Sequence, residues 1–200
     1  MKNRRISITA GILAAGLAFG LPALAQDEPY VVHDTKPVIM AGPYLSSLSE
    51  TGATIVWLTD TPCHVKVVYG LKGEAMSREA DNAAHGFLPI GLLHAVHLEG
   101  LEPGRAYAYK AVATRVVKMK AYWPEKGLAA ESPERTFTTF DRAKAEVAFC
   151  AIADTHEDTA RVNDLLKAVD WVKTDFLVHL GDAFHGLESE DQLFSRWLGP

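Results

Sequence analysis

Residues 53–69 read ATIVWLTDTPCHVKVVY, and they contain two short segments rich in β-branched and aromatic side chains. Residues 53–59 and 64–69 each have the composition of a β-strand, and Thr61-Pro62 between them is typical of a turn. We therefore expect two strands here, joined as a hairpin or as neighbours in a sandwich.

Similar segments continue between residues 36 and 140. Residues 93–98 and 106–114 form a second expected pair, joined by turn residues, and residues 135–140 form a last strand. Seven or so short strands in about 105 residues predict an all-β, immunoglobulin-like sandwich. Residues 116–133 are then a long connection, a kind of segment that often carries function, and its Trp123 either lines a cleft or packs between domains.

The segment Leu101-x-Pro103-Gly104-x-x-Tyr107 resembles the turn and tyrosine corner of fibronectin type III domains. Trp57 falls where those domains place a core tryptophan. The resemblance covers most of residues 36–140 and implies a structural role, in which the tyrosine hydroxyl hydrogen-bonds to the backbone of the turn.

Residues 1–25 have the features of a secretory signal peptide: a basic start, an apolar run over residues 6–21 and the small residues Ala23 and Ala25. The run is shorter than the roughly 20 apolar residues that span a bilayer, so we expect cleavage after Ala25 and no stable membrane insertion. The paired Arg4 and Arg5 also permit twin-arginine export. Residues 26–35 would be a linker, and the protein would be periplasmic or secreted.

Composition indicates a globular protein, with 48% hydrophobic residues, 22% charged residues and a formal charge of −5. This acidic balance predicts no nucleic-acid partner and favours small metabolites. Cys63 and Cys150 lie far apart in apolar segments, so we expect two buried thiols and no disulfide framework. The sequence carries no indication of an oligomeric state.

The hydrophobic pattern changes near residue 146. Residues 147–153 are a continuous apolar run, residues 158–173 have apolar side chains three and four positions apart, and residues 176–180 are a second apolar run. This order predicts a right-handed βαβ unit whose parallel strands are buried on both faces.

Polar residues follow both expected strands. Asp154 and His156 come after the first strand, and Asp182 follows Gly181 after the second. Because parallel strands end at the same edge of a sheet, these side chains are expected to lie close together. Two carboxylates and an imidazole suit Zn, Mn or Fe better than Ca or Mg. No Gly-rich loop follows the first strand, which argues against a nucleotide-binding cradle.

Asp154-x-His156 followed by Gly181-Asp182 resembles the first two sequence blocks of the calcineurin-like metallophosphoesterases. A fibronectin-like domain ahead of them narrows the resemblance to the purple acid phosphatase type. The resemblance implies hydrolysis of a small-molecule phosphate ester at a centre of two metal ions (Fe, Zn or Mn). In that family pattern Asp154 and His156 would bind the first metal, and Asp182 would bridge both.

Two features depart from the family pattern. His185 stands where the purple enzymes have a tyrosinate ligand, so it is a candidate catalytic residue with three open roles: substitute ligand, phosphate contact or loop residue. The family's later blocks, an Asn-His pair, a further His and a Gly-His-x-His, do not follow Asp182. Residues 188–198 instead predict one more helix.

We therefore expect residues 146–200 to be the N-terminal part of a truncated catalytic domain, inactive alone. The alternative is an extracytoplasmic sandwich that binds a partner and carries a vestigial metal site.

Overall fold

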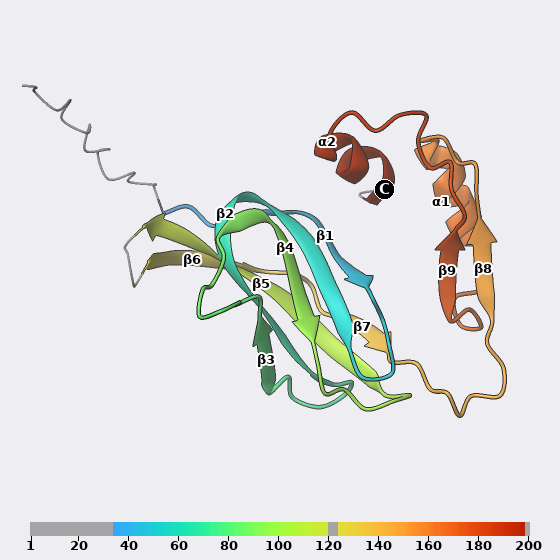
Figure 1. Ribbon diagram of the computed structural model, residues 1–200, viewed down its shortest axis with the longest axis horizontal. Helices are drawn as coiled ribbons and strands as arrows, with labels where there is room; N and C mark the ends of the chain where they lie inside the picture. Colours follow the sequence, from blue (N-terminus) through green and yellow to red (C-terminus); the bar gives the residue numbers. More distant parts are fainter. Residues whose placement is uncertain (1–33, 120–123, 199–200) are drawn as a thin grey trace, which may run out of the picture. The chain divides into compact units, whose positions relative to one another are not determined.

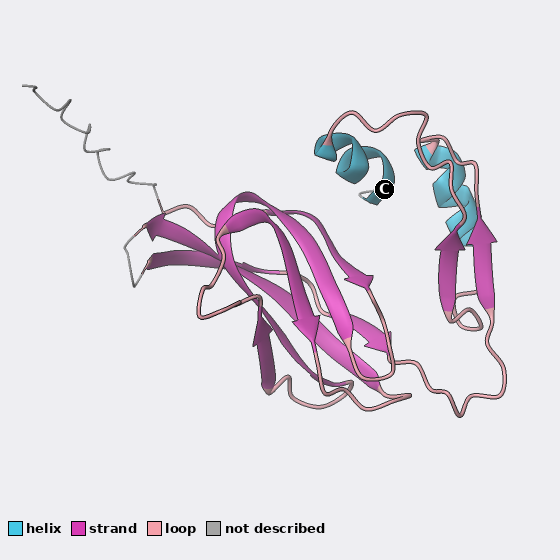
Figure 2. Cartoon of the chain, in the orientation of Figure 1, coloured by secondary structure: helices cyan, strands magenta, loops and turns pink. Residues whose placement is uncertain are grey.

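The computed structural model describes residues 34–119 and 124–198. The predicted signal peptide and Trp123 lie outside these residues. Among the described residues, seven antiparallel strands come first and the helices follow them (Figures 1 and 2). The strands are β1 (Ile39–Ser46), β2 (Ala53–Leu71), β3 (Arg78–Asp81), β4 (Gly91–Leu98), β5 (Ala106–Lys118), β6 (Glu125–Glu131) and β7 (Arg135–Thr138).

The prediction of two separate strands within residues 53–69 is wrong, because this whole segment belongs to the single strand β2. Ile55 and Trp57 face the core, and so do Val65 and Val67 beyond Pro62. The two-residue alternation therefore continues through the proline without a change of face. Pro62 is tolerated because β2 changes partner there, and a proline is acceptable where a ladder is irregular.

The two halves of β2 pair with different strands. Residues 53–59 pair with β1 and β4, whereas residues 63–71 pair with β5 and, near the end, with β3. The expected pairing of residues 93–98 with 106–114 is wrong in the described part of the chain, since β4 and β5 each pair with β2 instead. The result is the sandwich-like arrangement of antiparallel strands that the pattern predicted.

The core of this sandwich is built around Trp57, which is fully buried together with Ile55 and Val67. Tyr107 is also buried, and its hydroxyl accepts a hydrogen bond of 2.9 Å from the backbone N–H of Glu102. This contact is the tyrosine corner expected from the Leu-x-Pro-Gly-x-x-Tyr segment, and it holds the turn before β5 against the strand.

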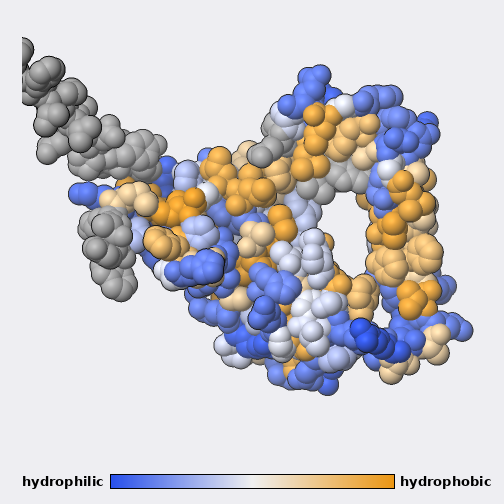
Figure 3. All heavy atoms as spheres, in the orientation of Figure 1, coloured by the Kyte–Doolittle hydropathy of each residue, from blue (hydrophilic) through white to orange (hydrophobic). Residues whose placement is uncertain are grey.

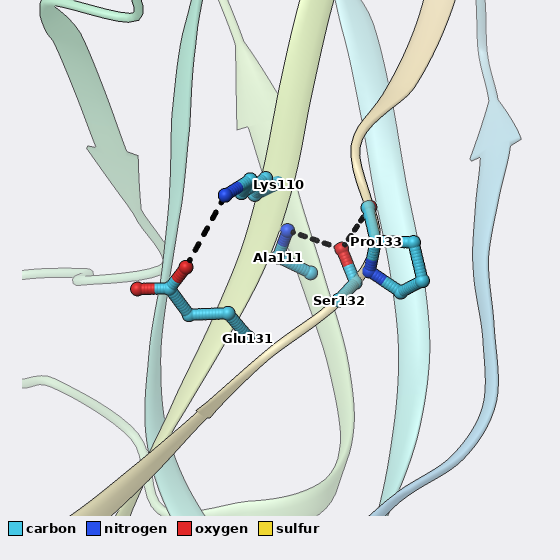
Figure 4. Close-up of polar contacts among 5 residues, drawn as sticks. All are labelled: Lys110, Ala111, Glu131, Ser132 and Pro133. Atoms are coloured by element: carbon cyan, nitrogen blue, oxygen red, sulfur yellow. Dashed lines mark hydrogen bonds and ion pairs between the residues drawn. The ribbon is translucent and has the colours of Figure 1, made fainter.

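Residues 116–133 are not a long open connection, because β6 pairs with the end of β5 within them. Figure 4 shows how the following residues continue this attachment. The Ser132 hydroxyl accepts a hydrogen bond of 3.0 Å from the Ala111 N–H and donates one to the Pro133 carbonyl. Beside it, Lys110 and Glu131 form an ion pair at the surface.

The C-terminal part of the chain contains the parallel strands β8 (Phe149–Ile152) and β9 (Phe176–His179), connected through α1 (Thr159–Ala168). Asp158 caps α1, since its carboxylate accepts a hydrogen bond from the Arg161 N–H. The strand, helix, strand order is therefore present, with shorter elements than predicted. The helix expected over residues 188–198 consists of α2 (Glu190–Leu193) and a π-helical segment (Phe194–Leu198).

The prediction that β8 and β9 are buried on both faces is wrong. Phe149 is 61% exposed, and Val162 is the buried residue of α1. Figure 3 shows hydrophobic side chains on the visible surface of this part of the chain. Two short strands and one helix are too few to cover both faces of a sheet. For the same reason Cys150 is partly exposed, whereas Cys63 is buried as expected, and both are free thiols.

Within the described residues, no helix has both the length and the apolar character needed to cross a membrane.

Candidate functional site

The loops that follow β8 and β9 lie side by side and are joined by backbone hydrogen bonds. All three bonds run from a backbone N–H to a backbone carbonyl oxygen, with N···O distances of 2.8 to 3.1 Å. The pairs are Asp154 to Gly181, His156 to Asp182, and Glu157 to Ala183. These bonds extend the pairing of the strands past their ends. They bring the three predicted metal ligands to one edge of the sheet, as the parallel arrangement required.

The backbone of these loops is strained. Asp154, His156, Glu157 and Asp182 all have positive φ angles, between 45° and 62°. Residues other than glycine seldom adopt this left-handed conformation, and such residues concentrate at functional sites, where the surrounding structure holds them. Four of them within two facing loops are a local feature that the strand pattern did not predict.

Asp154 and His156 make direct contact, since the Asp154 Oδ1 and His156 Nε2 atoms lie together. The other ring nitrogen, His156 Nδ1, is buried and has no hydrogen-bond partner among the described residues. Two donor atoms that converge, beside a third donor residue on the facing loop, fit one part of a metal site. No group of three His, Cys, Asp or Glu side chains is arranged around a common point in the described ranges, so the set is incomplete.

Thr155, between the two predicted ligands, points the other way and is only 2% exposed. Its hydroxyl lies 3.1 Å from His179 Nε2, and His179 Nδ1 accepts a hydrogen bond from the Gly181 N–H. His179 therefore supports the two loops from inside the strand rather than serving as a ligand.

The sequence did not predict an ion pair between the first of these loops and the C-terminal helical segment. Arg196, in the π-helical segment, forms an ion pair with Glu157, whose side chain is only 15% exposed. The hydrogen bond from Arg196 lowers the pKa of Glu157, and the backbone N–H of His185 stabilises the same carboxylate. Nothing in the spacing of residues 157 and 196 signals this pairing, because it depends on where the last helix lies.

His185 lies over His156. Their rings are stacked, with centroids 4.1 Å apart and an interplanar angle of 14°. The structure thus brings all four candidate residues, Asp154, His156, Asp182 and His185, to the same two loops.

The sandwich has a separate pocket of about 470 Å³ beside β3 and β4. Its polar lining includes Asp81, Asn82, His97 and Glu99, and Tyr69 forms part of its wall. His94, three residues before His97, is 1% exposed and faces the core. The two histidines therefore point to opposite faces of β4, as a spacing of three residues on a strand requires.

Comparison with solved structures finds a purple acid phosphatase, PPD1, from seeds of yellow lupin (Lupinus luteus). The TM-score is 0.50 at 16% sequence identity, and the match covers 74% of this chain and 30% of that one. The chain therefore spans less than a third of the phosphatase's length, and at this identity the likeness concerns the fold alone.

A second match is the sensor domain of the anti-sigma factor RsgI4 in Pseudobacteroides cellulosolvens, with a TM-score of 0.33 and 18% identity. It covers 55% of this chain and 97% of that one. No curated protein matches the chain in sequence.

A family model does match the sandwich. It covers residues 36–137, which begin just before β1 and end within β7, and so takes in slightly more than half of the 200 residues. By this match the chain belongs to the family described as a domain of unknown function, DUF7800.

Proposed function

We propose that this chain is the opening part of an exported, metal-dependent phosphoesterase of the purple acid phosphatase type. The observation that carries the proposal is the pair of strained, hydrogen-bonded loops with Asp154, His156 and Asp182 at one sheet edge. Open α/β sheets bind their ligands at this edge, beyond the carboxyl ends of parallel strands.

The coverage of the structural match gives further support. Residues 1–140 make up 70% of the chain, and the match to the lupin phosphatase covers 74%. It must therefore include residues of the C-terminal part as well as the sandwich. The likeness in fold is therefore not confined to the β-domain.

The exposed apolar surface of the C-terminal part also supports the proposal. Val147, Phe149 and Leu180 are each more than 60% exposed beside the two-stranded sheet. Side chains of this kind normally lie inside a domain, so further strands or helices of the same domain would cover them. Those elements would also supply the ligands that the described residues lack.

In such a site two metal ions would bind. Asp154 and His156 would hold one of them, and Asp182, on the facing loop, would contribute to the binding of both ions. Bound metal would supply Lewis-acid polarisation of the phosphate ester. The chain's own contribution is to position these ligands, because the hydrogen bonds between the loops fix their backbone before any ligand binds. The substrate would be a small-molecule phosphate ester, and the protein would act in the periplasm or outside the cell.

The test is hydrolysis of 4-nitrophenyl phosphate by this protein together with any coding sequence that follows residue 200. We expect metal-dependent turnover that EDTA abolishes, that Asp182→Asn reduces at least about a hundredfold, and that Asp164→Asn leaves unchanged. Asp164 is a suitable control because it is an exposed carboxylate on α1, paired with Lys167. The 200-residue chain alone should show little or no turnover.

Turnover that Asp182→Asn does not affect would contradict the proposed site. A folded protein without any turnover would favour the second candidate function, a binding module. The polar pocket beside β3 and β4 is the observation in favour of that alternative.

A further inference from the structure

His185 follows β9 by six residues, and its role is open because three functions are compatible with its place in the sequence. A substitute metal ligand needs a ring nitrogen directed at the ion, and a phosphate contact needs a ring N–H directed at the substrate. A residue that only supports its neighbour needs neither, but it does need the shape of the ring. The geometry of the His156–His185 pair bears on the first and the last of these roles.

The two rings are nearly parallel, with an interplanar angle of 14° and centroids 4.1 Å apart. A histidine binds a metal through a lone pair that lies in the plane of its ring, at about 2.0 to 2.1 Å. Two nearly parallel planes stacked in this way do not converge on a common ion at that distance. His185 is therefore not a partner ligand for a metal that His156 binds.

The backbone of His185 is held in place by a hydrogen bond to Glu157. Its N–H stabilises the carboxylate of Glu157, and Arg196 pairs with that carboxylate from the π-helical segment. Glu157 directly follows His156 in the facing loop, and its own N–H donates to Ala183. The stacked ring thus comes from a segment that is tied to the loop that it covers.

His156 is correspondingly held on two sides. Asp154 contacts its Nε2 atom, and the His185 ring covers its face. Its backbone N–H donates to Asp182, which fixes the point from which the side chain begins. Of these groups only the His185 ring is not a candidate ligand, and a group that orients a metal-binding imidazole can strengthen metal binding without touching the ion.

We propose that His185 is a positioning residue, which stacks on His156 and holds that imidazole against Asp154 through the shape of its ring and without a nitrogen ligand. The purpose of this positioning, metal binding by His156, rests on the proposed function. The stacking of the two rings does not depend on it.

The test compares His185→Phe, which keeps a flat aromatic ring, with His185→Leu, which fills a similar space without one. The first readout is the NMR signals of the His156 ring protons, assigned with His156→Gln. We expect the upfield signals of a stacked ring in the wild type and in His185→Phe, and a downfield shift in His185→Leu. His97→Leu, on the exposed face of β4, should leave them in place.

The second readout is Zn²⁺ binding by the same proteins, followed by isothermal titration calorimetry. We expect His185→Phe to bind within about twofold of the wild type and His185→Leu to bind about tenfold more weakly, a typical loss when a supporting group is removed. Equal weakening by both substitutions would show that a ring nitrogen matters and would overturn the proposal. Ring signals that do not differ between the two variants would also overturn it.

If none of the proteins binds Zn²⁺, the His156 ring signals still test whether His185 stacks on His156. The absence of Zn²⁺ binding would then count against the proposed function and not against the stacking. Circular dichroism of each variant separates these outcomes from unfolding.

Discussion

At the scale of single residues, His94 is the buried group with the clearest chemical consequence. It is 1% exposed, lies against Trp57, and its Nε2 atom is 2.9 Å from the Thr59 hydroxyl. Burial lowers the pKa of His94 from its ordinary value to about 4. The folded protein therefore keeps this imidazole neutral at pH values at which the unfolded chain protonates it.

Stability should fall as the pH falls through this range. Below an unfolded pKa near 6.5 the unfolded state binds a proton that the folded state does not, and the loss continues until the pH reaches about 4. At roughly 1.4 kcal/mol per pH unit, the His94 contribution between pH 7 and pH 4 is about 3 kcal/mol. Urea unfolding at a series of pH values measures it.

The comparison needs a variant that removes the titration and keeps a hydrogen-bond donor. His94→Gln should flatten the pH dependence over this range relative to the wild type. Burial also lowers the pKa of His64, so a smaller slope remains in His94→Gln. Identical slopes in wild type and His94→Gln would contradict this account.

At the scale of elements, the attachment of β6 to β5 depends on one side chain more than on its neighbours. Ser132 forms two hydrogen bonds with Ala111. Its hydroxyl accepts one from the Ala111 N–H, and its backbone N–H donates one to the Ala111 carbonyl. Glu131, one residue earlier, makes only an exposed ion pair with Lys110. The two positions form a matched comparison.

Ser132→Ala leaves the N–H of Ala111, in a buried position, without a partner, so we expect a loss of about 1 to 2 kcal/mol in the free energy of unfolding. Glu131→Gln should cost less than about 0.5 kcal/mol, because exposed ion pairs contribute little. Thermal and urea unfolding of both variants would measure the difference. A larger loss for Glu131→Gln would show that the ion pair is the stronger attachment.

The strands also show where sequence patterns succeed and fail. The tyrosine corner could be predicted because it is local: Tyr107 and Glu102 are five residues apart and joined by a fixed turn. The continuity of β2 was missed because Pro62 was interpreted as a turn, although the odd-numbered positions from Ala53 to Tyr69 that face the core give the correct answer. Local polarity cannot reveal which strands will pair, and β4 and β5 were therefore paired wrongly.

At the scale of the whole molecule, the two parts of the chain differ in how well they are covered. The sandwich buries Trp57, Tyr107 and their neighbours, whereas the C-terminal part exposes Phe149 and Leu180. Few buried contacts mean that local opening costs little free energy. We expect amides in β8, β9 and α1 to exchange with deuterium at least roughly a hundredfold faster than those in β2 and β5.

Hydrogen exchange followed by mass spectrometry or NMR checks this expectation within one protein. Equal protection in both parts would mean that the C-terminal part is stable as it stands, and the argument for further covering elements would fail.

The candidate site was predictable only where it depends on the arrangement of neighbouring strands. Asp154, His156 and Asp182 could be placed together because parallel strands end at one edge. The stacking of His185 and the Glu157–Arg196 pair were not predictable, since both depend on how the loops and the last helix fold back. The positive φ angles at four of these residues have no signature in their side chains.

The central claim is that these loops form part of a metal site, and Zn²⁺ binding to the 200-residue chain tests it most directly. We predict one weakly bound Zn²⁺ per wild-type chain, retained in Asp164→Asn and lost in both Asp154→Asn and Asp182→Asn. Binding that these two substitutions do not weaken, or no binding by the folded wild-type chain, would contradict the account.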